Sequence, residues 1–308
     1  MTLLDQCARL ALGLESVEVV LLERPTTGGG VRRTALVRLR GQGKEGCGEE
    51  VTFQQTDLLE SAPSVELFVG VATLADLWAR LDEAELFERA PRHDVVRSYR
   101  RWAFEAAALD LALRQAERSL ADVVGHAPRP VRFVVSPPHG LLRRFPDARL
   151  KIDAADLEPG LPVDVVDFKG SGDEALVKRA RTLYPEALLE DPPFLVEDAR
   201  VSWDIGIRSA ADVVALPSRP AGINVKPARL GSIRVLLELY ERCAADGIAV
   251  YGGGQHELGP GRAQIQTLAA LFHPNAPNDV APSAYNEATP PADLPLSPLS
   301  VPNRPGFG

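Results

Sequence analysis

Charged side chains close a series of short apolar runs in the second half of the chain. Asp167, Glu190 and Asp204 each end one run, at intervals of 23 and 14 residues, and Lys151 and Lys226 end the runs on either side. Three carboxylates that converge repel each other unless a cation lies between them, and hard oxygen ligands suit Mg²⁺. A lysine beside a dication has a lowered pKa, because the like charge disfavours its ammonium form. Such a lysine can act as a general base near pH 7.

The segments that carry these residues alternate between strand and helix patterns. Helical patterns at 173–183, 232–245 and 262–272 follow several of the apolar runs. Parallel strands need a returning segment, so this repetition predicts a parallel sheet. Seven runs, with an eighth near 279–281, favour a (β/α)8 barrel, whose C-terminal strand ends share one mouth. An open doubly wound sheet is the alternative. The seven runs are 131–135, 149–152, 163–168, 187–189, 201–205, 223–225 and 248–251.

Two connections in this half are too short for a full helix. Residues 153–163 contain two prolines and a glycine, and residues 190–201 are similarly brief. The fold class predicted is therefore α/β, with a (β/α)8-type barrel that is partly reduced in its outer ring.

The first 125 residues have a different pattern. Strand patterns at 16–23 and 34–40 flank a glycine-containing segment, which predicts a hairpin. Helices are expected at 73–80, with Thr73 as N-cap, and at 95–120, where apolar residues recur at intervals of three and four. Gly125 ends this helical region, and Trp102 and Phe104 are expected in the core. These features predict an α+β unit ahead of the barrel.

Composition narrows the class of protein. The 308 residues are 45% apolar and carry a net charge of −8, which suits a globular core and disfavours a nucleic-acid binder. Cys7, Cys47 and Cys243 are an odd number of widely spaced cysteines, so a disulfide framework is not expected and a cytoplasmic location is. No secretion signal or membrane span is apparent, so no membrane partner is expected. A homo-oligomer remains open.

Three further segments carry motifs: residues 101–111, 222–232 (GINVKPARLGS) and 257–263 (ELGPGRA). In that order they resemble the linker helix before the barrel, the strand-six motif and the strand-seven motif of the enolase superfamily. The branch that they resemble is that of muconate-lactonizing enzyme and o-succinylbenzoate synthase, within the mandelate racemase/muconate lactonizing enzyme group. The resemblance implies an α+β capping domain with linker helix at 1–125 and a barrel at 126–281. A proline-rich C-terminal tail at 282–308 is expected on the surface.

The resemblance also implies roles for the charged residues. Asp167, Glu190 and Asp204 match the ligands of Mg²⁺, with Mn²⁺ as a substitute, and no other cofactor is expected. Lys151 and Lys226 match two lysines on opposite sides of the substrate's α-carbon, and Glu257 matches a supporting carboxylate. The implied reaction is removal of a proton α to the carboxylate of a small substrate, through a metal-stabilised enolate. Elimination, cycloisomerisation and epimerisation all start this way, so the enzyme would be a lyase or an isomerase.

Three positions depart from the pattern of the family. Arg149 stands where the family has a lysine, Lys169 replaces an asparagine, and Ile205 replaces a glutamate. Arg149, Lys169 and His256 are possible accessory residues, with Lys169 lying in the site or pairing with Asp191 or Asp204. These departures keep open a barrel that binds a ligand or partner without catalysis. Segments 25–30 and 49–53 are expected to close over the mouth, the first as a flexible lid.

Overall fold

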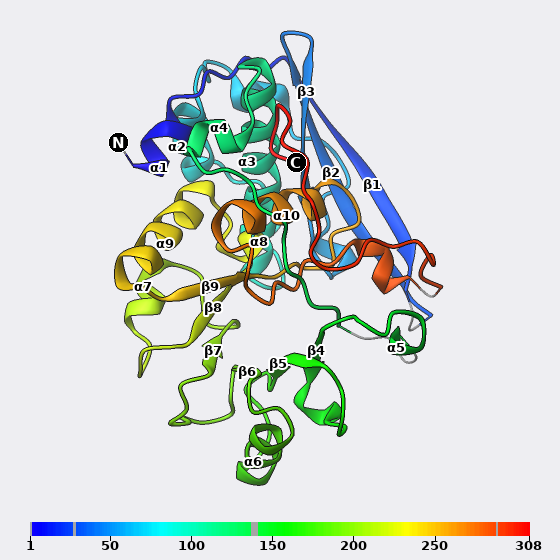
Figure 1. Cartoon of the computed structure of the whole chain (residues 1–308). Helices are drawn as coiled ribbons and strands as arrows, with labels where there is room; N and C mark the ends of the chain where they lie inside the picture. The colour runs from blue at the N-terminus through cyan, green and yellow to red at the C-terminus, as the bar shows by residue number, and fades with distance from the viewer. Residues whose placement is uncertain (1, 27–28, 137–140, 288) are drawn as a thin grey trace.

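The computed structural model describes residues 2–26, 29–136, 141–287 and 289–308. Its N-terminal part holds an antiparallel sheet in the order β1-β2-β3, formed by Ser16–Pro25, Val31–Gly41 and Lys44–Glu50. The predicted hairpin is confirmed by continuous pairing of β1 with β2. Four helices pack with this sheet in the upper part of Figure 1. They are α1 (Leu3–Ala8), α2 (Leu74–Glu83), α3 (Val95–Gln115) and α4 (Leu120–Val124), with 3-10 turns at Gln55–Asp57 and Val65–Phe68.

The second part is a six-stranded parallel sheet in the order β4-β5-β6-β7-β8-β9. Its strands are Leu150–Asp153, Val163–Asp167, Leu188–Glu190, Val201–Trp203, Gly222–Val225 and Ala249–Gly252. The helices around it are α5 (Leu141–Arg144), α6 (Glu174–Leu183), α7 (Ala210–Val214), α8 (Pro227–Leu230), α9 (Ile233–Asp246) and α10 (Pro260–Phe272). The connection from β4 to β5 contains a 3-10 turn, Ala154–Asp156, in place of an α-helix. Within the described residues, the connection from β6 to β7 contains no helix. The expected loss of part of the outer ring is thus confirmed.

Single bridges continue the sheet at both edges. Val135 pairs with Leu150 of β4, and Gly253, just after β9, pairs with Asp279. Phe133 pairs with Asn278, which joins the two edge segments to each other. The predicted first and eighth strands are therefore single-bridge segments, and the fold is a reduced (β/α)8 barrel with an N-terminal capping domain.

The long helix of the capping domain ends earlier than expected. The sequence predicted a helix over 95–120, but α3 ends at Gln115, so the prediction is wrong for its last turn. Ser119 starts a separate helix instead: its hydroxyl accepts from the Asp122 backbone N–H, and its own N–H donates to the Asp122 carboxylate. This reciprocal capping box stabilises a new helix start at Ser119, so α3 and α4 are separate helices.

Two glycines of β3 let α3 lie directly on the sheet. A Cβ added at Gly48 would come within 2.0 Å of the Ala103 carbonyl oxygen, and one at Gly46 within 2.4 Å of the Ala107 carbonyl oxygen. Only glycine permits such an approach. The contact buries Trp102 and Phe104, whose predicted place in the core is confirmed.

The end of the chain packs against the capping domain. Phe307 is fully buried, lies edge-on to Trp102, and donates its backbone N–H to Asp110 at 2.8 Å. Leu299 bridges to Val131 on the way. The last segment, red in Figure 1, follows this path beside α10 toward α3. The prediction of a surface tail is wrong for Phe307, because burying a large aromatic side chain stabilises the folded chain.

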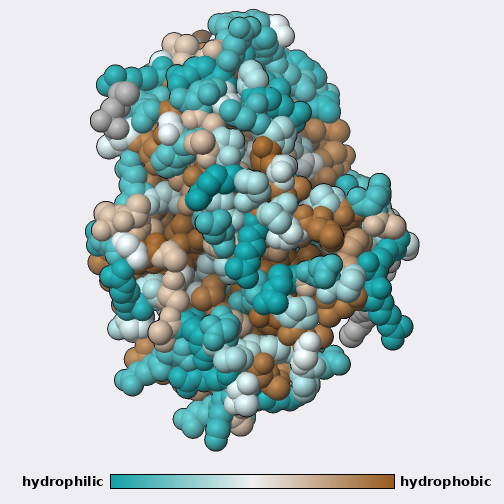
Figure 2. Space-filling model, in the orientation of Figure 1, coloured by the Kyte–Doolittle hydropathy of each residue, from teal (hydrophilic) through white to brown (hydrophobic). Residues whose placement is uncertain are grey.

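The outer surface in the view of Figure 2 is largely hydrophilic at its upper and lower ends, and hydrophobic residues are more frequent across its middle. No helix among the described residues is both long and apolar enough to cross a membrane. The three cysteines are all free, as expected.

A buried histidine holds the closing segment of the barrel. His273 Nδ1 lies 2.6 Å from Asn278 Oδ1, which also accepts the Gly252 N–H at 2.7 Å. His273 Nε2 faces the Tyr240 hydroxyl at 3.0 Å. Because Asn278 Oδ1 only accepts, Nδ1 carries the proton and Nε2 accepts from Tyr240 in the neutral ring. Burial lowers the pKa of His273 to about 4.

This shift predicts a loss of stability in acid. The folded-state pKa lies below the unfolded value of about 6.5, so between these values the unfolded chain binds a proton that the folded chain does not. The free energy of unfolding should fall as pH drops from about 6.5 to 4, by up to about 3 kcal/mol from this residue. Urea denaturation of the wild type and His273→Gln at both pH values checks it. Equal pH dependence in the two proteins would contradict the assignment.

Candidate active site

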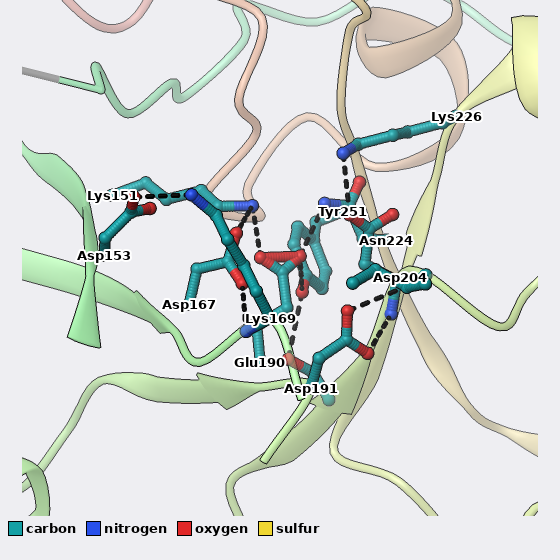
Figure 3. A network of polar contacts seen from close by, with 12 residues as sticks. Lys151, Asp153, Asp167, Lys169, Glu190, Asp191, Asp204, Asn224, Lys226 and Tyr251 are labelled. Atoms are coloured by element: carbon teal, nitrogen blue, oxygen red, sulfur yellow. Dashed lines mark hydrogen bonds and ion pairs between the residues drawn. The ribbon is translucent and has the colours of Figure 1, made fainter. Parts of the chain in front are cut away.

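Glu190 lies at the centre of the barrel mouth with no exposed surface. Its Oε1 accepts from Asn224 Nδ2 at 2.6 Å and from the Tyr251 hydroxyl at 3.0 Å. The Tyr251 hydroxyl lies 2.9 Å from that of Ser202. These contacts come from β6, β7, β8 and β9, and they hold Glu190 so that Oε2 faces β4 (Figure 3).

Lys151 is the cation that meets this second oxygen. Its ammonium group forms an ion pair with Glu190 Oε2 and lies 3.4 Å from Asp167 Oδ2. Burial alone would lower the pKa of Lys151, but the negative charges of Glu190, Asp279 and Asp167 outweigh it and raise the pKa. In this arrangement Lys151 is protonated, which differs from the lowered pKa expected beside a dication.

Asp204 is held by a separate pair of cations. Lys226 Nζ lies 2.6 Å from Oδ2, and Arg229 donates to Oδ1 and to the Asp204 backbone carbonyl, each at 2.6 Å. Burial would raise the pKa of Asp204, but Lys226 and Arg229 lower it below the usual value. Asp191, at φ 45°, accepts the Asp204 and Ile205 backbone N–H groups at 2.9 Å and fixes this strand end.

The predicted metal ligands fit Mg²⁺ in donor type but are not preassembled around one point. Within the described residues, no three acidic, histidine or cysteine side chains are arranged to hold an ion. The ammonium of Lys151 nevertheless lies between Asp167 and Glu190, so these two carboxylates already share a cation. Glu190 Oε2 is buried, and the Lys151 ammonium is its partner among the described residues. A metal bound by all three carboxylates would replace Lys151 at these oxygens. Asp204 would also have to give up its contact with Lys226 or Arg229.

Glu257 supports the loop after β9 and does not project into the mouth as a free carboxylate. Its Oε1 accepts the Gln255 N–H at 2.6 Å, and its Oε2 pairs with Arg262 at 2.9 Å. The same loop is held from the capping domain by Glu49, which accepts N–H groups from Leu258 at 2.6 Å and from Gly259 at 2.9 Å. Burial has the largest effect on the Glu49 carboxyl, and it raises the pKa of this group.

Glu49 therefore changes the interpretation of segment 49–53. The sequence suggested that this segment closes over the mouth, but Glu49 is the next-to-last residue of β3, with 1% exposure, and holds the loop after β9. Phe53 alone fits a covering role, since it is 55% exposed and lies edge-on to His256. A pocket of ≈ 180 Å³ lies between the two domains here, lined in part by Arg24, Phe53 and Leu258. The predicted lid at 25–30 includes residues 27 and 28, which lie outside the described residues.

Two accessory residues are turned away from the mouth. Arg149, the residue before β4, pairs with Asp164 near the start of β5, at the end of the strands that lies away from the mouth. Lys169, at φ 53°, pairs with Asp153, so its expected pairing with Asp191 or Asp204 is wrong. The left-handed backbone at Lys169 directs its side chain outward along the barrel rim. Like-charge repulsion from Lys151 also favours this orientation.

Sequence reasoning missed four residues that complete the site. Asn224 and Arg229 lie in the 222–232 motif, two residues before and three after Lys226. Their closeness to Lys226 in the sequence was an available signal that they belong to the site. Tyr251 looks like an ordinary core residue of an apolar strand. The sequence analysis used Asp279 only to mark the expected eighth strand. It did not consider that a carboxylate in that strand would lie near the same mouth as Asp167.

Comparisons with known proteins agree with this architecture. Family models of the N-terminal and C-terminal domains of a domain of unknown function (DUF8230) match residues 5–123 and 127–287. N-succinylamino acid racemase of an Amycolatopsis species is 30% identical over 253 residues, 67% of each chain. Dipeptide epimerase of Enterococcus faecalis V583 has a similar fold, with a TM-score of 0.74 at 17% identity over 96% of this chain and 99% of that one.

A third comparison concerns a structure described as a mandelate racemase/muconate lactonizing enzyme from Roseovarius nubinhibens, complexed with magnesium. Its TM-score is 0.70 at 18% identity, and the match covers 96% of each chain. The capping domain and barrel thus define the class of fold. The chain belongs to the enolase superfamily, in its mandelate racemase/muconate lactonizing enzyme branch, and within it to the DUF8230 family.

The ion pair of Lys151 predicts a large effect on stability. Lys151→Met leaves Glu190 and Asp167 buried without their cation, which should lower the free energy of unfolding by about 3–5 kcal/mol. Adding Glu190→Gln to this variant removes the stranded charge and should recover part of the loss. Lys169→Met is the control, because its pair is exposed and worth about 1 kcal/mol or less. Urea denaturation measures all four proteins; equal losses in the two lysine variants would contradict the interpretation.

Proposed function

We propose that the protein abstracts a proton α to the carboxylate of a small substrate, as a metal-dependent lyase or isomerase of its superfamily. One observation carries this proposal: Lys151 and Lys226 lie on opposite sides of a buried carboxylate cluster at the barrel mouth (Figure 3). Both lysines reach the mouth from strand ends, and a group placed between them meets one ammonium on each face. The relatives, all at modest identity, are racemases, epimerases, synthases and cycloisomerases of this branch.

In the proposed mechanism Asp167, Glu190 and Asp204 would hold Mg²⁺ or Mn²⁺. The ion would act as a Lewis acid on the substrate's carboxylate and offset the charge of the developing enolate. Asn224 and Tyr251 keep Glu190 oriented, and Asp191 keeps the backbone of Asp204 in place. Lys151 takes the α-proton once the charges of Glu190 and Asp167 no longer hold it protonated.

The role of Lys226 decides the outcome. As a second acid–base group it delivers a proton to the opposite face, which produces epimerisation. As a fixed ammonium ion it stabilises the enolate, which leads to elimination or cycloisomerisation. In the arrangement described, Lys226 pairs with one oxygen of Asp204 and Arg229 with the other.

A second candidate function is binding without catalysis. All six oxygens of Asp167, Glu190 and Asp204 already contact groups of the protein, five through Lys151, Lys226, Arg229, Asn224 and Tyr251 and one through a backbone N–H. A barrel whose carboxylates are neutralised internally needs no ion to remain folded. This observation favours a repurposed ligand-binding site if no metal binds.

Deuterium exchange tests the proposed base. In D₂O the wild type should exchange the α-proton of its substrate, found by screening a library of dipeptides, N-acyl amino acids and sugar acids, because a lysine exchanges its own protons with solvent. Lys151→Ala should reduce exchange at least about 100-fold, the usual contribution of a general base. Lys169→Ala is the matched control and should keep it. Exchange retained in Lys151→Ala with one enantiomer supplied would exclude Lys151 as the base for that face.

Metal binding separates the two candidate functions without an activity assay. MgCl₂ should raise the melting temperature and give a binding isotherm by calorimetry, since an ion that binds only the folded state stabilises it by mass action. Asp167→Asn should weaken binding, whereas Asp153→Asn, at the end of β4 but paired with Lys169, should not. Absence of binding and of stabilisation with both Mg²⁺ and Mn²⁺ would favour the non-catalytic alternative.

A further inference from the structure

Another cavity, of ≈ 350 Å³, lies where the start of α3 meets the loop after β7. The capping domain and the barrel both contribute to its wall. The lining residues are Arg92, His93, Asp94 and Val95 of the capping domain and Arg208 of the barrel. The three carboxylates predicted to bind metal do not line it, so the proposed reaction makes no use of this cavity.

The wall of this cavity carries an excess of positive charge. Arg92 and Arg208 are exposed, and neither guanidinium forms a hydrogen bond or ion pair with a residue that the structure describes. Asp94 is the acidic residue of the wall, and its carboxylate likewise has no ion pair with a described residue. Two arginines and one aspartate leave at least one positive charge in excess, in a chain whose net charge is −8.

Neighbouring arginines of α3 have structural contacts. Arg97 pairs with Glu85 at 2.9 Å. Arg100 donates to the backbone carbonyls of Leu86 at 2.8 Å and Asp57 at 2.6 Å. These contacts hold the segment that precedes α3, and the arginines of the cavity wall take no part in them.

The backbones of Arg92 and Arg208 are held in place, whereas their side chains are free. The Arg92 N–H donates to the Asp57 carboxylate at 3.1 Å, and the Arg208 N–H donates to the Asp212 carboxylate at 3.0 Å. The two arginines therefore face one cavity from anchored segments of different domains. An ion that binds between them has only the two side chains to order, which keeps the entropic cost of binding small.

Tyr99 lies between this cavity and the mouth. It follows Val95 by one turn on the same face of α3, it is 8% exposed, and its hydroxyl has no hydrogen-bond partner among the described residues. Burial raises the pKa of Tyr99, and positive charges that include Arg229 and Arg208 oppose the rise. Arg229 also binds Asp204. An anion at Arg208 would therefore alter the electrostatic potential next to the mouth.

We propose that this cavity binds an oxyanion of the phosphate class, held between Arg92 and Arg208. A planar carboxylate presents both of its oxygens to one guanidinium, whereas a tetrahedral phosphate can offer oxygens to two guanidinium groups that approach from different sides. The ion is either free phosphate or the phosphate group of a small metabolite. In both cases it bridges the capping domain and the barrel, and its binding does not depend on the proposed reaction.

Calorimetry with simple anions tests the proposal. At constant ionic strength, balanced with NaCl, sodium phosphate and glycerol 3-phosphate should bind the wild type, and sodium acetate should bind at least about tenfold more weakly. Arg92→Gln and Arg208→Gln should each weaken phosphate binding about tenfold or more, because each removes a charge-assisted contact. Arg89→Gln is the matched control, since Arg89 is exposed in the same segment but does not line the cavity. This variant should keep the wild-type affinity.

Four results would overturn the assignment. They are no binding of either phosphate compound, acetate binding as tight as phosphate binding, affinity unchanged in both cavity variants, and an equal loss of affinity in Arg89→Gln. Because both cavity arginines are exposed, Arg92→Gln and Arg208→Gln should unfold in urea at the wild-type midpoint when no phosphate is present. Tighter binding of glycerol 3-phosphate than of inorganic phosphate would identify the ligand as an organic phosphate. The reverse order would identify it as the free ion.

Discussion

A carboxylate with no solvent contact costs several kcal/mol unless opposite charge and hydrogen-bond donors surround it, and Glu190 is such a carboxylate. Three strands supply what it needs: Asn224 of β8 and Tyr251 of β9 bind one oxygen, and Lys151 of β4 binds the other. Each of these groups must lie at the C-terminal end of its strand to reach Glu190. The buried charge of Glu190 therefore favours one register of the parallel sheet. In that register Asp167 lies beside Glu190, and Ser202, two residues before Asp204, lies on its other side.

The capping domain takes part in this arrangement through the loop after β9. Glu49 binds backbone N–H groups near the start of α10, and Arg32 binds carbonyl groups of the same loop. One side chain supplies acceptors and the other supplies donors, so the loop backbone is satisfied on both sides by the capping domain. His256 and Glu257 owe their positions to these two residues, which belong to a different domain.

Patterns of strand and helix predicted most of the barrel because each strand end carries a polar residue at β/α spacing. Asp167, Glu190, Asp204, Lys151 and Lys226 were found this way, and the structure brings them to one mouth. The ion pairs of Arg149 and Lys169 were not predictable, since they depend on which strand ends lie side by side and, for Lys169, on a left-handed backbone. The path of Phe307 depends on a hollow that exists only after folding, and no local pattern signals it.

The barrel is joined at its seam by few backbone hydrogen bonds, among them Val134 N–H to the Asn278 carbonyl and Asp279 N–H to the Gly252 carbonyl. The pairs β6–β7 and β7–β8 are joined by two residue pairs each, and opening at the seam likewise breaks few backbone hydrogen bonds. Such low-energy openings expose backbone amides to solvent while the rest of the fold stays intact. Asp279 lies in this seam, so its position relative to Lys151, whose ammonium its charge stabilises, depends on these few contacts.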